Sequence, residues 1–91
     1  GFICILYANV QSSRPLVAPF GGSDARFVTN PYCTAIPATD KHPMFLLDMA
    51  TSTIAMGKAR VADLSGKQVP EGSVIDPEGN PTTDPSVMFS D

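Results

Sequence analysis

Apolar runs separated by turn residues dominate the first half of the chain. Residues 1–10 are almost wholly apolar, residues 32–36 are rich in aromatic and β-branched side chains, and residues 44–47 are apolar again. Short runs of this kind between Gly, Pro, Asn and Asp clusters are typical of strands. The polar turn at residues 40–43 joins the last two runs and favours antiparallel pairing. Residues 16–18 predict a short further strand at most.

The periodicity changes after Asp48. Apolar side chains at Ile54, Val61 and Leu64 recur at helical spacing, which predicts a helix over residues 52–64 lying on the sheet. Residues 69–81 are dense in Pro, Gly, Asp and Asn and predict no regular structure. Asp84 followed by Pro85 predicts an N-cap and a helix over residues 85–89. The pattern predicts an α+β fold, a mainly antiparallel sheet with one long helix packed on it.

Composition limits the size of the core. Ninety-one residues, 43% of them hydrophobic and 16% charged, fit at most one small domain and carry fewer charges than the roughly 25% typical of a soluble domain. A strand at residues 1–10 that is apolar on both faces needs cover on both sides. We therefore expect residues 1–91 to be a fragment of a single larger domain, with no second domain in the chain.

Charge and cysteine content exclude several classes of protein. The net charge of −3 and six scattered basic residues give no patch for nucleic acid. The longest apolar run, residues 2–8, is far shorter than the roughly 20 residues that span a bilayer. Cys4 and Cys33 are too few for a disulfide framework or a zinc site. We interpret them as reduced core thiols, with a disulfide between neighbouring strands as the alternative, and we expect no metal.

Asp48 stands where the last apolar strand meets the predicted helix. The first turn of a helix leaves backbone N–H groups without partners and can hold an anion or a polar ribose edge. The alternative is structural: Ser52 caps the helix and Asp48 stabilises its start. Lys58 and Arg60 could reach phosphate groups or simply form a solvated face. His42 falls in a turn without a catalytic partner, so we interpret it as a solvated turn residue.

Several motifs resemble one known family in content and in order. The sequence is similar to the malate/L-lactate dehydrogenases, a non-Rossmann family of NAD(P)-dependent oxidoreductases that also contains hydroxycarboxylate, sulfolactate and ureidoglycolate dehydrogenases. The resemblance spans almost the entire chain. Its motifs are Val17-Ala18-Pro19-Phe20-Gly21-Gly22, Thr29-Asn30-Pro31, Leu47-Asp48-Met49-Ala50-Thr51-Ser52, Gly57-Lys58 and Pro81-Thr82-Thr83-Asp84-Pro85.

The resemblance implies site residues as well as a fold. Ser13, Asp48, Met49 and Ala50 match positions that contact the nucleotide, and the implied cofactor is NAD or NADP. Arg14 stands where some relatives have an aspartate and could pair with a substrate carboxylate or a cofactor phosphate. Thr29 and Asn30 match a motif near the active site and receive no role. The proton-transferring histidine belongs to a motif that this chain does not contain, so the resemblance assigns no catalytic residue here.

Two functions remain in view from the sequence. In the first, the chain is the central cofactor-binding portion of a cytoplasmic, homo-oligomeric enzyme that interconverts a small 2-hydroxy acid and a 2-oxo acid. That enzyme would need residues outside this chain for proton transfer, so we expect the 91-residue chain alone to be inactive. In the second, the chain is a non-catalytic binding or assembly module that retains only the fold. Asp48 favours an unphosphorylated ribose on electrostatic grounds, while Lys58 and Arg60 could offset this preference.

Overall fold

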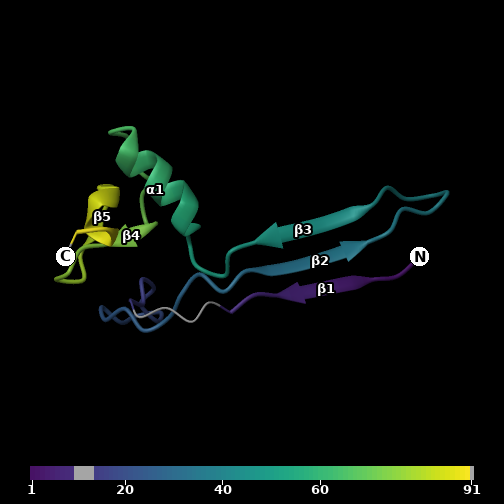
Figure 1. The fold of residues 1–91 in the computed structure, drawn as a ribbon, viewed down its shortest axis with the longest axis horizontal. Coiled ribbons are helices and arrows are strands. Elements are labelled where there is room, and N and C mark those ends of the chain that lie inside the picture. Colours follow the sequence, from purple (N-terminus) through teal and green to yellow (C-terminus); the bar gives the residue numbers. More distant parts are fainter. Residues whose placement is uncertain (10–13, 91) are drawn as a thin grey trace.

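The chain divides into an extended sheet and a helical part (Figure 1). The computed structural model describes residues 1–9 and 14–90. The Cα radius of gyration is 16.1 Å, compared with about 12 Å expected for a compact domain of this length. In chain order the elements are β1 (Cys4–Tyr7), β2 (Tyr32–Ile36), β3 (Phe45–Met49), α1 (Met56–Leu64), β4 (Val74–Ile75), β5 (Pro81–Thr82) and the 3-10 helix η1 (Pro85–Met88).

The three long strands form one antiparallel sheet in the order β1-β2-β3. This confirms the predicted α+β class and the antiparallel pairing. β2 has the predicted bounds, whereas β3 runs two residues beyond the predicted end at residue 47, because its ladder with β2 continues to the Tyr32–Met49 pair. Asp48 therefore lies inside a strand, opposite Cys33, instead of ending it.

The beginning of the chain is less regular than predicted. β1 covers only Cys4–Tyr7 of the predicted residues 1–10, and Val10 lies outside the described residues. The predicted strand at residues 16–18 is reduced to an isolated antiparallel bridge between Val17 and Phe27. The prolines and paired glycines around this segment interrupt any longer ladder.

Both faces of the sheet expose apolar side chains. Leu6 and Leu46 lie on one face and are 59% and 58% exposed, while Ile5 and Phe45 lie on the other and are both 53% exposed. Side chains that alternate between two faces need a covering layer on each. Within the described residues neither face has one. Cys4 is exposed as well, so the expected core position is wrong for this thiol.

The buried core lies in the helical part instead. Among the described residues, the buried hydrophobic ones are Ala59 of α1, Val74 of β4, and Val69 in the segment between these two elements. The helix packs against η1, and the Arg60 guanidinium lies 3.9 Å from the centre of the Phe89 ring. The partly buried side chains around this core are Ile54, Ala62, Val87, Met88 and Phe89.

The helix begins later than predicted. α1 starts at Met56, its N-cap is Ala55, and no side chain caps it. The Ser52 hydroxyl instead donates a 2.7 Å hydrogen bond to the Ile54 carbonyl, a local bond of the kind by which Ser competes with helix formation. The predicted N-cap role of Ser52 is therefore wrong, and the residues before Met56 form an irregular connection.

The segment predicted to lack regular structure contains a small hairpin. β4 and β5 pair antiparallel, with Val74 opposite Thr82. One carboxylate oxygen of Asp76 closes the turn between them by accepting hydrogen bonds from the backbone N–H groups of Glu78 and Asn80 at 3.0 and 2.8 Å. Side chains of Asp often stabilise turns in this way. The prediction of no regular structure is wrong here, because strands of two residues are too short to show an alternating pattern between the turn residues.

The predicted helix after Asp84 is present as η1. Asp84 is its N-cap, with its side chain accepting a 3.0 Å hydrogen bond from the Ser86 backbone N–H, and Pro85 occupies the first turn. Backbone and side-chain hydrogen bonds from Ser86 lower the pKa of the Asp84 carboxyl. The capping prediction is confirmed.

Candidate functional site

A groove of about 880 Å³ lies where β3 leads into α1. Its lining comes from Thr29 and Pro31, from residues 48–50, from residues 52–58, and from residues 68–70 together with Ala62 and Ser73. Ligand pockets in proteins have volumes of about 300 to 1,000 Å³. The groove is therefore large enough for part of a dinucleotide, and it includes three of the predicted cofactor residues: Asp48, Met49 and Ala50.

Asp48 supplies a carboxylate to this groove. It is exposed, and its Cα pairs with that of Cys33 across the ladder, so both side chains lie on one face of the sheet. Desolvation raises the pKa of the Cys33 thiol, and the charges of Asp48 and Cys4 raise it further. Cys33 therefore stays protonated at neutral pH. The Asp48 carboxylate offers hydrogen-bond acceptors to the groove.

The start of α1 supplies donors to the same groove. Met56, Gly57 and Lys58 all line it, no acidic residue occupies the first turn, and no side chain caps the helix. Uncapped N–H groups at a helix start carry partial positive charge and suit an anion, to which Lys58 adds a full one. Arg60 points elsewhere, because its guanidinium stacks on Phe89. Arg60 is exposed and does not line the groove, which agrees with the solvated-face interpretation of this residue.

Thr51 ties two parts of the lining together. Its backbone N–H donates to the Thr29 carbonyl at 3.0 Å, and its hydroxyl lies 3.1 Å from that oxygen and 2.7 Å from the Asn30 carbonyl. Thr29 itself lines the groove. Nothing in the sequence indicated that Thr51 would be its partner.

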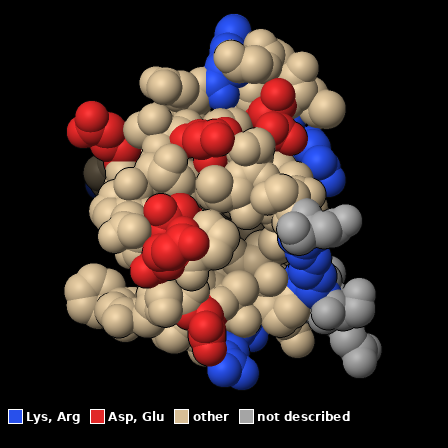
Figure 2. All heavy atoms as spheres, turned by 90° about the vertical axis from the view of Figure 1, so that its left-hand side faces the viewer, with Lys and Arg blue, Asp and Glu red and all other residues tan. Residues whose placement is uncertain are grey.

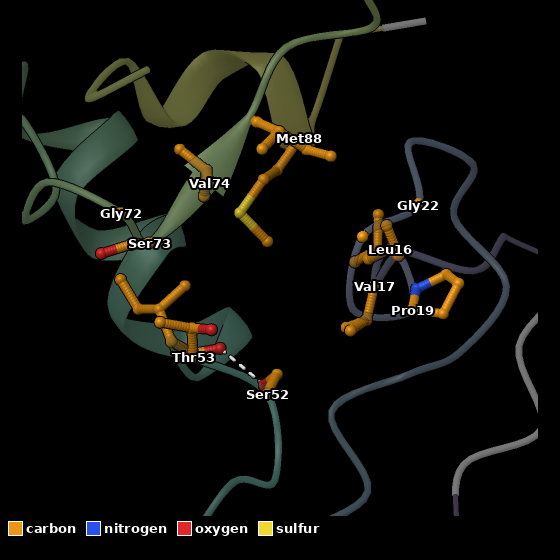
Figure 3. Close-up of a pocket in the computed structure, with 14 residues that line it drawn as sticks. Leu16, Val17, Pro19, Gly22, Ser52, Thr53, Gly72, Ser73, Val74 and Met88 are labelled. Carbon is orange, nitrogen blue, oxygen red and sulfur yellow. Dashed lines mark hydrogen bonds between the residues drawn. The ribbon is translucent and has the colours of Figure 1, made fainter. Parts of the chain in front are cut away.

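A smaller cavity of about 230 Å³ adjoins the groove. Ser52, Thr53, Ile54 and Ser73 line both spaces. Figure 3 shows Leu16, Val17 and Pro19 on one side of this cavity and Val74 and Met88 on the other. The loop before β2 thus faces the core of the helical part. No local pattern indicates that these segments, far apart in the chain, would meet.

The predicted substrate-binding residue Arg14 lies apart from the groove. Arg14 lines a separate pocket of about 230 Å³, and its guanidinium donates a hydrogen bond to the Ser90 carbonyl. Ser13 lies outside the described residues. His42 is exposed in the turn before β3, where its backbone N–H donates to the Thr39 hydroxyl at 3.1 Å, which confirms its interpretation as a turn residue.

Other kinds of site are not found in the described part of the chain. Residues 1–9 and 14–90 contain no group of three or more His, Cys, Asp or Glu side chains that could hold a metal ion. None of the helices described is long and apolar enough to cross a membrane. On the face drawn in Figure 2, acidic side chains are scattered among uncharged ones and basic side chains form no continuous patch.

The chain resembles known proteins over its whole length. Residues 1–91 match the family described as malate/L-lactate dehydrogenase. The chain belongs to this family. It is 50% identical over 91 residues to an L-lactate dehydrogenase from Cupriavidus necator, covering 100% of this chain and 26% of that protein. It is 36% identical over 90 residues to a (2R)-3-sulfolactate dehydrogenase (NADP(+)) from Chromohalobacter salexigens, covering 99% and 26%.

The fold is shared with solved members of the family. A sulfolactate dehydrogenase from Methanocaldococcus jannaschii superposes with a TM-score of 0.71 at 38% identity, over 96% of this chain and 23% of that one. The chain therefore spans about a quarter of the length of the relatives it matches. This confirms the resemblance on which the site residues were predicted.

Proposed function

We propose that the chain is the cofactor-binding portion of an NAD(P)-dependent oxidoreductase that interconverts a small 2-hydroxy acid and a 2-oxo acid. The observation that carries this proposal is the groove, because Asp48, Met49 and Ala50 line it together with the uncapped start of α1. Family membership supports the reaction class, and a relative named as NADP-dependent supports a nicotinamide cofactor. The resemblance assigns no catalytic residue here, so proton transfer falls to a residue that this chain does not supply.

The residues of the groove fit a dinucleotide. The Asp48 carboxylate can accept hydrogen bonds from ribose hydroxyls, and the first turn of α1 with Lys58 can hold a diphosphate. These opposite charges line one groove, matching a ligand that carries both hydroxyl donors and anionic oxygens. When bound, the cofactor supplies the hydride acceptor or donor.

The other site assignments stay proposals. Ser13 would contact the cofactor, and Arg14 would pair with the substrate carboxylate. The Arg14 guanidinium already donates a hydrogen bond to the Ser90 carbonyl. A substrate carboxylate would therefore be a second acceptor for the same guanidinium. We further propose that the enzyme is a homo-oligomer and acts in the cytoplasm.

Titration with NADH tests the proposal. In the whole protein, Asp48→Ala should raise the Kd for NADH by roughly tenfold to a hundredfold, because a hydrogen bond to a charged group contributes about 1.5–3 kcal/mol. Asp40→Ala is the matched control, since this exposed carboxylate lies in the turn before β3 and away from the groove. Absence of NADH binding by a folded sample would contradict the proposal.

A binding or assembly module without catalysis is the second candidate. The observation that favours it is the exposure of apolar side chains on both faces of the sheet, since such surfaces mark interaction sites. It predicts a folded protein that self-associates without binding NADH. Self-association should then weaken in Leu46→Glu, as measured by sedimentation, and unchanged sedimentation would rule this candidate out.

A further inference from the structure

Thr51 makes hydrogen bonds just beyond the end of a ladder. The last paired residues of β2 and β3 are Tyr32 and Met49. Past this pair, Thr51 donates from its backbone N–H to the Thr29 carbonyl at 3.0 Å, and from its hydroxyl toward the Thr29 and Asn30 carbonyls at 3.1 and 2.7 Å. These bonds continue the contact between the two chain segments where the regular pairing has stopped.

Asn30 has the backbone conformation that makes this contact feasible. Its φ is +38°, and among the described residues no other non-glycine residue has a positive φ. In an extended chain, consecutive carbonyl groups point to opposite sides. A left-handed residue breaks this alternation, so that one hydroxyl can reach the carbonyls of both Thr29 and Asn30. Asn tolerates this conformation better than most residues.

The hydrogen bonds of its side-chain oxygen do not explain why an asparagine stands at position 30. Its Oδ1 is buried and accepts no hydrogen bond from the described residues. A buried acceptor without a partner destabilises the fold. The structural role of Asn30 therefore lies in its backbone conformation and not in its side-chain oxygen.

We propose that Thr51 is a positioning residue for cofactor binding, and that the left-handed backbone of Asn30 provides its second acceptor. Residues 48–50 line the groove, as do Thr29 and Pro31. The Thr51 bonds hold these two parts of the lining in register before any ligand arrives, which lowers the ordering cost of binding. This inference rests on the proposed function, because it assumes that the groove takes the cofactor.

The test compares two threonines of the same hairpin. Thr51→Val removes the hydroxyl donor and should raise both the Kd for NADH and the KM for cofactor about fivefold, as expected for one hydrogen bond, with kcat changed less than about twofold. Thr51→Ser keeps the hydroxyl and should restore both values. Thr39→Val is the control, since the Thr39 hydroxyl accepts two backbone hydrogen bonds at the opposite end of β2 and β3.

Asn30 variants separate backbone from side chain. Gly adopts a positive φ without strain, whereas Ala does not. We expect Asn30→Ala to raise the Kd for NADH about as much as Thr51→Val does. Asn30→Gly should leave the Kd near that of the unaltered protein. Equal loss in both Asn30 variants would overturn the backbone role.

The outcomes distinguish this inference from the function on which it rests. If Asp48→Ala weakens NADH binding but Thr51→Val and Thr39→Val have the same Kd for NADH, the positioning role is wrong and the cofactor site stands. If Thr51→Val lowers the melting temperature and leaves Kd unchanged, the bond is only structural and the inference fails. If the folded whole protein binds no NADH, both proposals fail.

Discussion

The charge of Asp48 should make the groove prefer NAD over NADP. Asp48 is an exposed carboxylate on the groove, and in the proposed site it faces ribose hydroxyls. NADP carries a phosphate on its adenine ribose, and a phosphate monoester has a charge of about −1.5 to −2 at pH 7. If Asp48 binds that ribose, NADP brings two like charges together, whereas NAD offers a hydrogen bond.

The size of the preference follows from the exposure of Asp48. Two unit charges about 4 Å apart in bulk water repel each other by about 1 kcal/mol, and the bulk value applies because the carboxylate is solvated. With the phosphate charge, the repulsion becomes about 1.5–2 kcal/mol. This corresponds to a Kd for NADPH roughly ten to thirty times that for NADH. Asp48→Ser replaces the carboxylate with a neutral hydroxyl that can still hydrogen-bond to the ribose, and should reduce the ratio to near unity.

Paired fluorescence titrations with NADH and NADPH measure this ratio. Raising the ionic strength should reduce it, because salt screens charges at exposed sites. Lys58 lines the same groove and works in the opposite direction, so Lys58→Met should increase the preference for NADH. Equal Kd values in the unaltered protein, or a ratio that Asp48→Ser does not change, would refute the electrostatic reasoning.

Three further predictions concern stability and thiol chemistry. Val74→Ala removes two carbons from a side chain that is 8% exposed and should lower the unfolding free energy in urea by about 1.5–3 kcal/mol. Hydrogen bonds from Ser86 lower the pKa of Asp84, so its ionised form adds stability above the unfolded-state pKa. The melting-temperature advantage over Asp84→Asn should shrink as pH falls through the folded-state pKa, and an advantage independent of pH would contradict this. Cys4 is exposed, while desolvation, Asp48 and Cys4 raise the pKa of Cys33; at pH 8 iodoacetamide should modify Cys4 first by mass spectrometry.

Local patterns predicted most of the fold. β2 was predicted with its observed bounds, because its side chains and flanking turn residues point to the same structure. η1 was predicted from Asp84 and Pro85, since capping is a short-range interaction. The start of α1 was predicted four residues too early, because the Ser52 hydroxyl bonds to the Ile54 carbonyl instead of capping a helix. The β4–β5 hairpin was missed, since two-residue strands leave no periodicity.

The site was only partly predictable for a different reason. Asp48 could be found because strand and helix patterns meet near it and because the family resemblance covers it. Thr51 and Asn30 could not, because their interaction joins residues 21 positions apart and depends on a positive φ that sequence does not specify. Likewise, residues 68–70 line the groove only because the chain returns past α1 after the helix ends. Such contacts follow from tertiary structure and leave no local signal.

The position of the groove explains why cofactor affinity is the measurement most sensitive to substitutions in the connection between β3 and α1. Asp48 belongs to the sheet, whereas Lys58 and Val69 belong to the helical part, and all three line one groove. The main contacts between elements fall within each part: β2 packs with β1 and β3, and β4 packs with β5 and η1, which also contacts α1. The connection at residues 50–55 therefore aligns two parts that share little packing of their own (Figure 1). A substitution that loosens this connection removes little buried area, so its effect on the melting temperature is small. A ligand that contacts both parts needs them aligned, so its Kd rises when the alignment is lost.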